Sequence, residues 1–340
     1  EIANGDWSSD VCSSDLAFYV EQVSQLTTTT GKDYLQFVLN DGEKKQTASC
    51  FNPPVGAEPS MYIHKVVRMT LVQKGNYLNI EGEKWVVTEW DQEPENSPLR
   101  KIKVRSDITP DMLITAVEAC MKLNMHERFR NLFKFMDYKG LIRSYGDTPA
   151  GLKVHHSLKG GLIQHVYEMM SLYYNMTKSA LIKPLRHEFV VMAILFHDYG
   201  KLKEYNLEKW DNTDQMPILG HIYISAHTLS NIIDEYNRVI EAAVKEDQTA
   251  IAVCNERDMF VGENMIISNH DRDLMVHCIL AHHGQRDFGS PVVPCISEAM
   301  VMHFVDMISG RMNMFQNTNH MEKNFFLDNT YVIKDYYEQD

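Results

Sequence analysis

Residues 187–201 read HEFVVMAILFHDYGK, an apolar run followed at once by a histidine and an aspartate. The run from Phe189 to Phe196 is eight residues long, far short of the ~20 residues that a membrane-spanning helix needs. It is the longest uninterrupted apolar run in the chain, so we exclude a membrane protein. Such a run is typical of a helix buried in a core, and His197 and Asp198 lie at the end of it. Buried ionisable groups are costly unless they are paired or bind a metal.

Helical spacing of apolar residues continues on both sides of this stretch. Thr109 is a suitable N-cap for a first helix, with Pro110 at its first position. We therefore expect residues 111–340 to form an all-α helical bundle, which makes the chain as a whole mostly α. The apolar stripes lie along residues 162–174, 187–196, 221–236, 274–281 and 298–314.

The region from residue 17 to residue 92 has a different periodicity. Short β-type segments alternate there with turn signals such as Asn52-Pro53-Pro54. Five or six short strands predict a small all-β barrel, for which an OB-fold is the best candidate, and such barrels bind single-stranded nucleic acid through exposed aromatic side chains. For each candidate aromatic residue, burial in the barrel core is the competing interpretation. The predicted strands are 17–25, 34–39, 45–51, 64–73, 77–80 and 85–90. The candidates for base stacking are Phe37, Phe51, Tyr62 and Tyr77.

Two further segments differ from their surroundings. Residues 1–16 share no periodicity with the rest of the chain and resemble translated sequencing-adapter sequence, so we expect them not to be native. Residues 93–110 are polar and contain Pro94 and Pro98, which is typical of a linker between two domains.

Charge is distributed unevenly along the chain. The net charge is -13, yet residues 98–160 contain 12 Lys and Arg against 6 Asp and Glu, whereas residues 161–340 contain 14 against 25. The basic stretch from Arg100 to Arg143 suits a polyanion such as a nucleic acid, and a solvated helix face is the alternative. The six cysteines form no CxxC pair and we find no secretory signal, so we expect a reducing, cytoplasmic environment.

Histidine and aspartate residues recur beside the apolar helical segments. For any single histidine, a hydrogen-bonded core or surface position is the simpler interpretation. Seven such residues in five segments instead predict a shared metal centre. Imidazole and carboxylate ligands suit Mn²⁺, Fe, Zn²⁺ or Ni²⁺ better than the all-oxygen shell that Mg²⁺ or Ca²⁺ prefers. The seven residues are His165, His197, Asp198, His221, His282, His283 and Asp306.

The order of these residues and the sequences around them resemble the HD-domain metal-dependent phosphohydrolases. The motifs are GGLIQH at 160–165, HDYGK at 197–201, LGH at 219–221 and LAHHG at 280–284, with an aspartate on a late helix. The resemblance implies an HD phosphohydrolase domain with two divalent metal ions, Mn²⁺ first and Fe, Co²⁺, Ni²⁺, Zn²⁺ or Mg²⁺ as alternatives. It further implies that one metal is held by His165, His197, Asp198 and Asp306. The second would be held by His221, His282 and His283, with Asp198 as a bridge.

A narrower resemblance covers residues 17 to about 315. The N-terminal barrel, the phrase HHSLKGGL at 155–162, and AHHG at 281–284 followed by DFGSP at 287–291 are similar to the YhaM-like 3′-to-5′ exoribonucleases. This family combines an OB-fold with an HD domain. The resemblance implies a metal-dependent phosphodiesterase that degrades single-stranded RNA, or DNA, from its 3′ end by two-metal hydrolysis.

Several other residues are candidates for catalysis or substrate binding. We expect Lys201 to neutralise a phosphate oxygen, with an exposed surface lysine as the alternative. His156 would donate a proton to the phosphate or leaving group, and His155 is a weaker candidate for the same role. The alternative is that such a histidine orients a metal ligand by a hydrogen bond on the side away from the metal. Further candidates for contacts with substrate are Gln285, Arg286 and Arg311, and a solvated loop is the alternative for the first two.

Two other functions stay open at this point. One is an HD phosphohydrolase of mononucleotides or cyclic nucleotides, in which the barrel serves as an oligomer contact. The other is a non-catalytic nucleic-acid-binding protein with a structural or sensory metal site, although a purely structural site keeps no open coordination position. The expected partner is single-stranded nucleic acid, with RNA favoured over DNA. We expect no association with a membrane, and a homo-oligomer is an open alternative.

Overall fold

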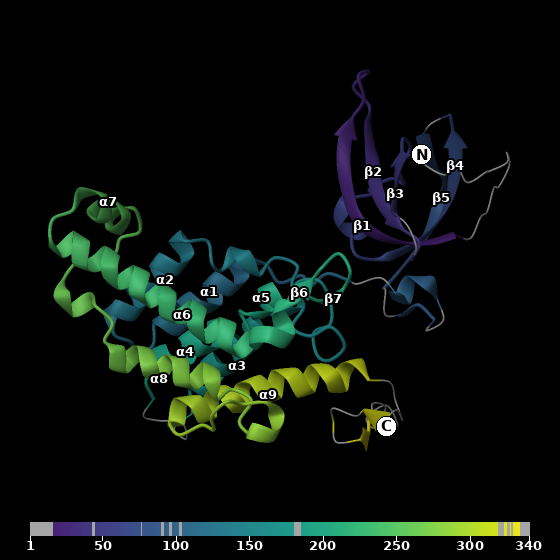
Figure 1. The fold of residues 1–340 in the computed structure, drawn as a ribbon. Coiled ribbons are helices and arrows are strands. Elements are labelled where there is room, and N and C mark those ends of the chain that lie inside the picture. The colour runs from purple at the N-terminus through teal and green to yellow at the C-terminus, as the bar shows by residue number, and fades with distance from the viewer. Residues whose placement is uncertain are drawn as a thin grey trace. The chain divides into compact units, whose positions relative to one another are not determined.

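The computed structural model describes residues 16–42, 45–75, 77–89, 92–94, 97–101, 104–179, 185–318, 323–324, 327 and 329–333. The expectation for residues 1–16 therefore concerns a segment that lies almost entirely outside the described residues. The chain divides into two compact units, Glu1–Val104 and Arg105–Asp340 (Figure 1). The division falls within residues 93–110, the segment that the sequence predicts to be a linker.

The first unit is a closed five-stranded barrel, as the sequence predicts. The strands follow one another around it in the order β1-β2-β3-β5-β4. β3 and β5 pair in parallel, and the other neighbours pair antiparallel. The segments 77–80 and 85–90, predicted as two strands, are one strand, because the chain passes an irregularity in its pairing with β4 instead of turning. The bounds are β1 Leu16–Thr27, β2 Asp33–Asn40, β3 Lys45–Cys50, β4 Val66–Lys74 and β5 Tyr77–Thr88, with a 3₁₀ turn at Pro59–Met61.

The core of the barrel decides which aromatic residues reach solvent. Phe37 lies in the middle of β2, where alternate side chains point inward, and it is 0% exposed. It packs edge-to-face against Tyr62 and Trp85, with ring centroids 5.6 Å away in both cases. Neither Phe37 nor the buried Tyr62 offers a ring face to a base, so the prediction that these two stack on nucleic acid is wrong. Phe51 follows the end of β3, is 40% exposed and stacks on Tyr34 at 4.8 Å.

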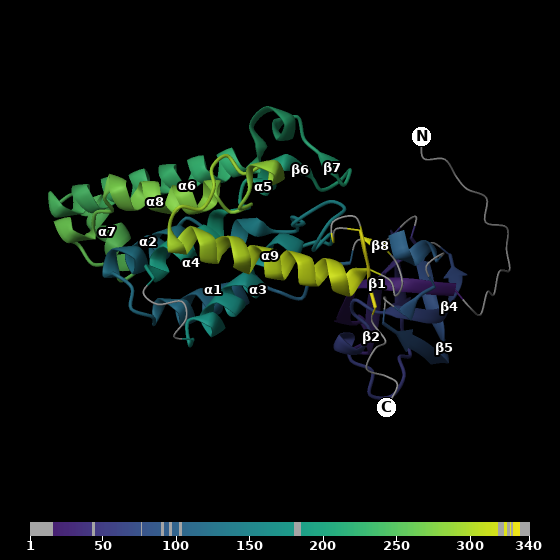
Figure 2. The same cartoon turned by 90° about the horizontal axis from the view of Figure 1, so that it is seen from below.

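The second unit is helical, so the chain is mostly α with an N-terminal β barrel, as predicted (Figures 1 and 2). Thr109 caps the first helix, since its side chain accepts a hydrogen bond from the main-chain nitrogen of Met112. The helices are α1 Pro110–Met121, α2 Glu127–Tyr138, α3 Gly161–Met176, α4 His187–Phe196, α5 Lys201–Glu204, α6 Gln215–Val244, α7 Gln248–Glu256, α8 Asn269–Leu280 and α9 Ser297–Asn317. Short strand pairs lie at β6 Tyr205–Asn206 with β7 Asp211–Asn212 and at β8 Lys323–Asn324 with β9 Thr330–Tyr331. The 3₁₀ turns lie at Pro98–Lys101, Arg143–Tyr145, Glu263–Met265 and Arg286–Phe288.

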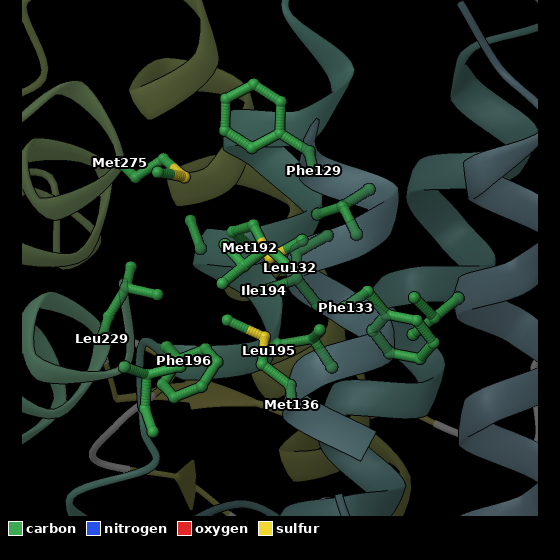
Figure 3. Packing of buried hydrophobic residues seen from close by; sticks show 14 of the residues in the cluster. Phe129, Leu132, Phe133, Met136, Met192, Ile194, Leu195, Phe196, Leu229 and Met275 are labelled. Atoms are coloured by element: carbon green, nitrogen blue, oxygen red, sulfur yellow. The ribbon is translucent and has the colours of Figure 1, made fainter. Parts of the chain in front are cut away.

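Helix α4 forms the centre of this unit. Its residues from Glu188 to Phe196 are all buried, which agrees with the apolar run in the sequence. It packs against α3, α6, α8 and α9, so its last residue points the following His197 and Asp198 into the bundle. None of the described helices is both long and apolar enough to cross a bilayer. Figure 3 shows side chains of this core. The labelled side chains are Phe129, Leu132, Phe133 and Met136 of α2, Met192, Ile194, Leu195 and Phe196 of α4, Leu229 of α6 and Met275 of α8.

Basic side chains of the stretch from Arg100 to Arg143 form ion pairs within the helical unit. Arg128 pairs with Asp271 at 2.8 Å and Lys139 pairs with Glu235 at 2.7 Å. These acidic partners lie more than 90 positions later in the chain, which explains why the sequence shows only an excess of positive charge. The side chains at 100–101 and all of residues 102–103 lie outside the described part of the chain. These ion pairs offset part of the positive charge, and a nucleic-acid surface along the described basic residues stays a prediction.

Candidate metal centre

Five segments of the helical unit bring their histidine and aspartate side chains to one place. His165 lies on α3, and His197 and Asp198 follow the end of α4. His221 lies on α6, directly after Gly220, whose non-helical backbone breaks that helix. His282 and His283 follow α8, and Asp306 lies on α9.

The potential ligand atoms form two groups. One nitrogen or oxygen atom from each of His165, His197 and Asp306 lies within 4.8 Å of the others. A second group, His221, His282 and His283, meets the same limit. Nε2 of His165 is 3.1 Å from Oδ1 of Asp306, while the rings of His282 and His283 lie 4.2 Å apart between centroids. The side chains thus gather in two adjacent clusters, each of a size that suits one metal ion.

Asp198 lies between the two groups. Its Oδ2 atom is 3.3 Å from Nε2 of His197, in the first group. Its Oδ1 atom is 3.5 Å from Nε2 of His221 and 3.9 Å from Nε2 of His282, in the second. Each carboxylate oxygen thus faces a different cluster, which is the arrangement of a bridging ligand.

Hydrogen bonds from behind the rings select the nitrogen that faces the centre. Nδ1 of His197 donates to the carbonyl of Ile194 at 3.0 Å, and Nδ1 of His282 donates to that of Ile279 at 2.6 Å. Nδ1 of His283 donates to the carbonyl of Phe288 at 2.7 Å. Bonds of this kind leave Nε2 as the nitrogen available to a metal.

Four buried polar atoms in the centre lack a hydrogen-bond partner among the described residues. They are Nε2 of His197, Nε2 of His221, Nε2 of His282 and Oδ1 of Asp198. An unsatisfied buried acceptor costs free energy, and several that converge on one place are explained by a cation that they share. The residues present therefore fit a divalent metal pair.

The charge states favour a cation as well. Burial lowers the pKa of His165 to about 4, although Asp306 works in the opposite direction. Burial, together with the neighbouring imidazoles, also holds the pKa of His282 well below its usual range. Burial would raise the pKa of Asp198, but Lys201 and His197 outweigh it and hold that pKa well below its usual range. Burial would lower the pKa of His197, but Asp198 outweighs it and raises that pKa. At neutral pH the neutral imidazoles of His165 and His282 thus lie beside the ionised Asp198.

No protein-family model matches the chain, and no solved structure matches it either. The chain is 23% identical over 333 residues to the 3′-5′ exoribonuclease YhaM of Oceanobacillus iheyensis, and the match covers 94% of this chain and 93% of that protein. This similarity supports the resemblance to the YhaM-like proteins that the sequence motifs indicate. Because the match extends over nearly the whole chain, it includes both the barrel and the helical unit.

The helical unit has two glutamates beside the centre that the sequence analysis missed, the buried Glu204 and the partly exposed Glu168. Oε2 of Glu204 lies 3.1 Å from Nδ1 of His221 and orients that ring. Glu168 accepts hydrogen bonds close to His165. The only signal for Glu168 was its position one helical turn after His165. Glu204 had none, because its partner lies on a different helix.

His156 does not have the role predicted first. It is 0% exposed, its Nε2 atom lies 2.8 Å from Oε2 of Glu168, and its Nδ1 atom lies 3.1 Å from Nδ1 of His155. Both ring nitrogens are therefore occupied, and the prediction that His156 donates a proton to the phosphate is wrong. The alternative, in which it orients its neighbours, agrees with the structure. His155 is half-buried, and its ring lies 4.7 Å from that of His165.

The remaining candidate residues differ in their exposure to solvent. Lys201 is buried, with Nζ 2.6 Å from both Oδ2 of Asp198 and the carbonyl oxygen of Ala150, so the surface alternative is wrong. Burial would lower its pKa, but Asp198 outweighs burial and raises it, so the ammonium group stays charged. Gln285 and Arg286 are exposed in the turn after His283, and Arg311 is half-buried on α9. Phe51 belongs to the barrel unit.

A close backbone approach explains the glycine of the HDYGK motif and gives a first prediction. A Cβ atom at Gly200 would overlap the carbonyl oxygen of His221. We expect Gly200→Ala to displace the main chain of His221, to cost about 1–3 kcal/mol of stability and to weaken metal binding. Calorimetric metal titration and thermal unfolding measure both effects.

Gly140→Ala is the control. Gly140 differs from Gly200 in its positive φ of 70°, and a Cβ atom there meets nothing within 4 Å. This variant should lose about 1 kcal/mol of stability because of its backbone conformation and should bind metal normally. Equal metal affinities in the two variants would show that the close approach at Gly200 has no bearing on the site.

Proposed function

We propose that this chain is a metal-dependent phosphodiesterase that removes nucleotides from the 3′ end of single-stranded RNA. The observation that carries the proposal is the carboxylate of Asp198, which lies between two clusters of potential ligand atoms, where three buried imidazole nitrogens lack a hydrogen-bond partner among the described residues. The similarity to an exoribonuclease over 94% of the chain supports the choice of a polynucleotide substrate. The distant match supports nuclease chemistry, and the donor set supports divalent cations, with Mn²⁺ as the first expectation.

Each residue of the centre has a role in the proposed reaction. His165, His197 and Asp306 would hold one metal ion, His221, His282 and His283 the other, and Asp198 would contact both. Bound metal ions supply a hydroxide nucleophile at neutral pH and stabilise the charge on the phosphoryl oxygens.

Lys201 has a supporting electrostatic role in this proposal. Its ammonium group lies 2.6 Å from Asp198 and compensates part of the negative charge of the buried carboxylates. It therefore holds Asp198 in place and ionised, in addition to providing positive charge near the substrate phosphate. Gln285, Arg286 and Arg311 remain proposed substrate contacts.

A degradation assay tests the proposal. A single-stranded RNA labelled at its 5′ end should give a ladder that shortens one nucleotide at a time in the presence of Mn²⁺. The same strand blocked at its 3′ end should resist, and a DNA strand of the same sequence tests the choice of sugar. Hydrolysis of mononucleotides or cyclic nucleotides alone would support the smaller-substrate alternative. Binding of RNA without hydrolysis under any of Mn²⁺, Co²⁺, Ni²⁺ or Mg²⁺ would support the non-catalytic one.

We propose further that the barrel unit binds the single strand, and this gives a second prediction. The exposed ring of Phe51 stacks on the half-buried Tyr34, and Tyr77 is 76% exposed. Since stacking on a base contributes about 1–3 kcal/mol, we expect Phe51→Ala to weaken RNA binding by roughly 5- to 150-fold. Fluorescence anisotropy with labelled RNA measures the loss.

The control for Phe51 is the buried aromatic residue in the same barrel. Phe37→Leu removes ring contacts in the core, so it should lower the melting temperature while the remaining folded protein binds RNA with nearly unchanged affinity. A loss of RNA affinity in Phe37→Leu that equals the loss in Phe51→Ala would show that the exposed ring makes no specific contact.

A further inference from the structure

Glu168 connects two hydrogen-bonded branches beside the metal centre. It lies on α3 and its carboxylate faces three donors. Oε2 accepts from Nε2 of His156 at 2.8 Å and from Oγ of Ser309 at 2.9 Å. Oε1 accepts from Nε2 of Gln164 at 2.9 Å. A carboxylate only accepts hydrogen bonds, so it dictates the direction of every bond in which it takes part.

The first branch leads to His165. A serine hydroxyl has a single hydrogen, and Ser309 donates it to Glu168. The oxygen of Ser309 must then accept from Nδ1 of His165, which lies 3.0 Å away. In the neutral ring Nε2 therefore has no hydrogen, and it faces the carboxylate oxygen of Asp306 at 3.1 Å. Two lone pairs at this distance repel each other, a cost that the hydrogen bonds through Ser309 offset in metal-free protein and that a cation between the two atoms removes.

The second branch leads to His155. Because Nε2 of His156 donates to Glu168, its Nδ1 atom is the acceptor in the neutral ring. The hydrogen bond of 3.1 Å between the two Nδ1 atoms must then be donated by His155. His155 consequently has a bare Nε2 atom. The backbone supports this arrangement, since the main-chain nitrogen of His156 donates to Oδ1 of Asn313 at 2.7 Å.

His165 differs in this respect from three other histidines of the centre. His197, His282 and His283 donate from Nδ1 directly to main-chain carbonyls, which are held in place by the fold itself. His165 instead donates to a hydroxyl, which can turn and act as donor or acceptor. Its tautomer is therefore defined only if something else takes the hydroxyl hydrogen.

We propose that Glu168 is a positioning residue that sets the tautomers of His165 and His155 through Ser309 and His156. The proposal deepens the proposed function, on which its metal-binding part rests. In this arrangement Glu168 makes Nε2 of His165 a metal ligand without touching the metal. It also leaves Nε2 of His155, whose ring lies next to that of His165, as a hydrogen-bond acceptor.

The first test measures the tautomers in metal-free protein by ¹⁵N NMR of the imidazole rings. In the wild-type chain, His165 and His155 should both show a protonated Nδ1 and a bare Nε2. Glu168→Ala should convert one or both rings to a mixture of tautomers. Glu188→Ala is the control, because Glu188 is more deeply buried than Glu168 and also accepts a hydrogen bond, from Nε of Arg186 at 2.6 Å, yet lies outside both branches.

The second test measures metal affinity. Residues that orient a ligand from behind typically affect affinity by about 10- to 100-fold. We expect a loss in this range for Mn²⁺ in Glu168→Ala and no such loss in Glu188→Ala. Glu168→Gln should restore most of the affinity, because its carbonyl oxygen can accept from both Ser309 and His156 if the amide of Gln164 turns over.

A milder variant covers the case in which Glu168→Ala does not fold. Ser309→Ala removes one oxygen and breaks only the branch to His165, so the tautomer of His165 should become mixed and that of His155 should not change. Unchanged tautomers and metal affinity in Glu168→Ala and Ser309→Ala would overturn the inference while the proposed function stands. Wild-type protein that binds no metal would end the proposed function, and the tautomer measurement would still decide the inference.

Discussion

Replacing Asp198 with asparagine should reduce hydrolysis of RNA by about 10³-fold or more, since metal ions contribute several kcal/mol to such reactions and each 1.36 kcal/mol is a factor of ten. Asparagine keeps the size of the side chain, but its amide nitrogen cannot bind a metal and only one oxygen remains. That oxygen can face one cluster, so the link between the two clusters is lost. Steady-state degradation rates and metal content per molecule measure the effect.

The variant also removes the partner of a buried cation. Lys201 lies 2.6 Å from Asp198, so Asp198→Asn should lower thermal stability as well, because breaking a buried ion pair leaves one charge uncompensated. Asp271→Asn is the control for this loss, because Asp271 is also buried and accepts from Arg128 at 2.8 Å on the far side of the core. It should destabilise the fold yet keep metal content and activity per folded molecule. Full activity in Asp198→Asn would remove Asp198 from the mechanism.

Removing metal with a chelator should abolish hydrolysis and lower the melting temperature of the helical unit. Four buried atoms that have no hydrogen-bond partner would lose the cation that satisfies them. At a metal concentration 100 times the dissociation constant, binding stabilises the folded state by about 2.7 kcal/mol. For a unit of this size that corresponds to a rise of roughly 5–10 °C in melting temperature when Mn²⁺ is added back. Differential scanning calorimetry measures the shift.

Two comparisons make this experiment decisive. The Asp198→Asn variant, treated in the same way, should show a much smaller rise on addition of Mn²⁺. A wild-type protein that is metal-free by elemental analysis and still degrades RNA at its full rate would rule out two-metal hydrolysis.

The helical bundle and the histidine and aspartate residues that it brings together could be predicted from the sequence, because they depend on local patterns. The run before His197 is apolar at every position from Phe189 to Phe196, so it predicts a central helix without knowledge of its neighbours. The motif glycines carry similar information: Gly200 is required where the main chain of His221 comes too close for any Cβ atom. The strands of the barrel were placed well except at 77–88, where one strand continues through an irregularity that resembles a turn in sequence.

The errors share one cause, which is that they depend on partners distant in the sequence. Phe37 and Phe51 are both aromatic residues of the β region, and only the register of β2 and the end of β3 place one inside the barrel and the other at its surface. The basic residues looked free because Asp271 and Glu235 follow them by about a hundred positions or more.

The sequence by itself predicts the parts of the site: a buried helix followed by His197 and Asp198, five further potential ligands at core-facing positions, and a β barrel with candidate stacking rings. Local spacing and the cost of burying charge suffice for that. Only the tertiary structure decides which nitrogen of His165 and His221 faces the centre, because the groups that bond their Nδ1 atoms, Ser309 and Glu204, come from other parts of the fold.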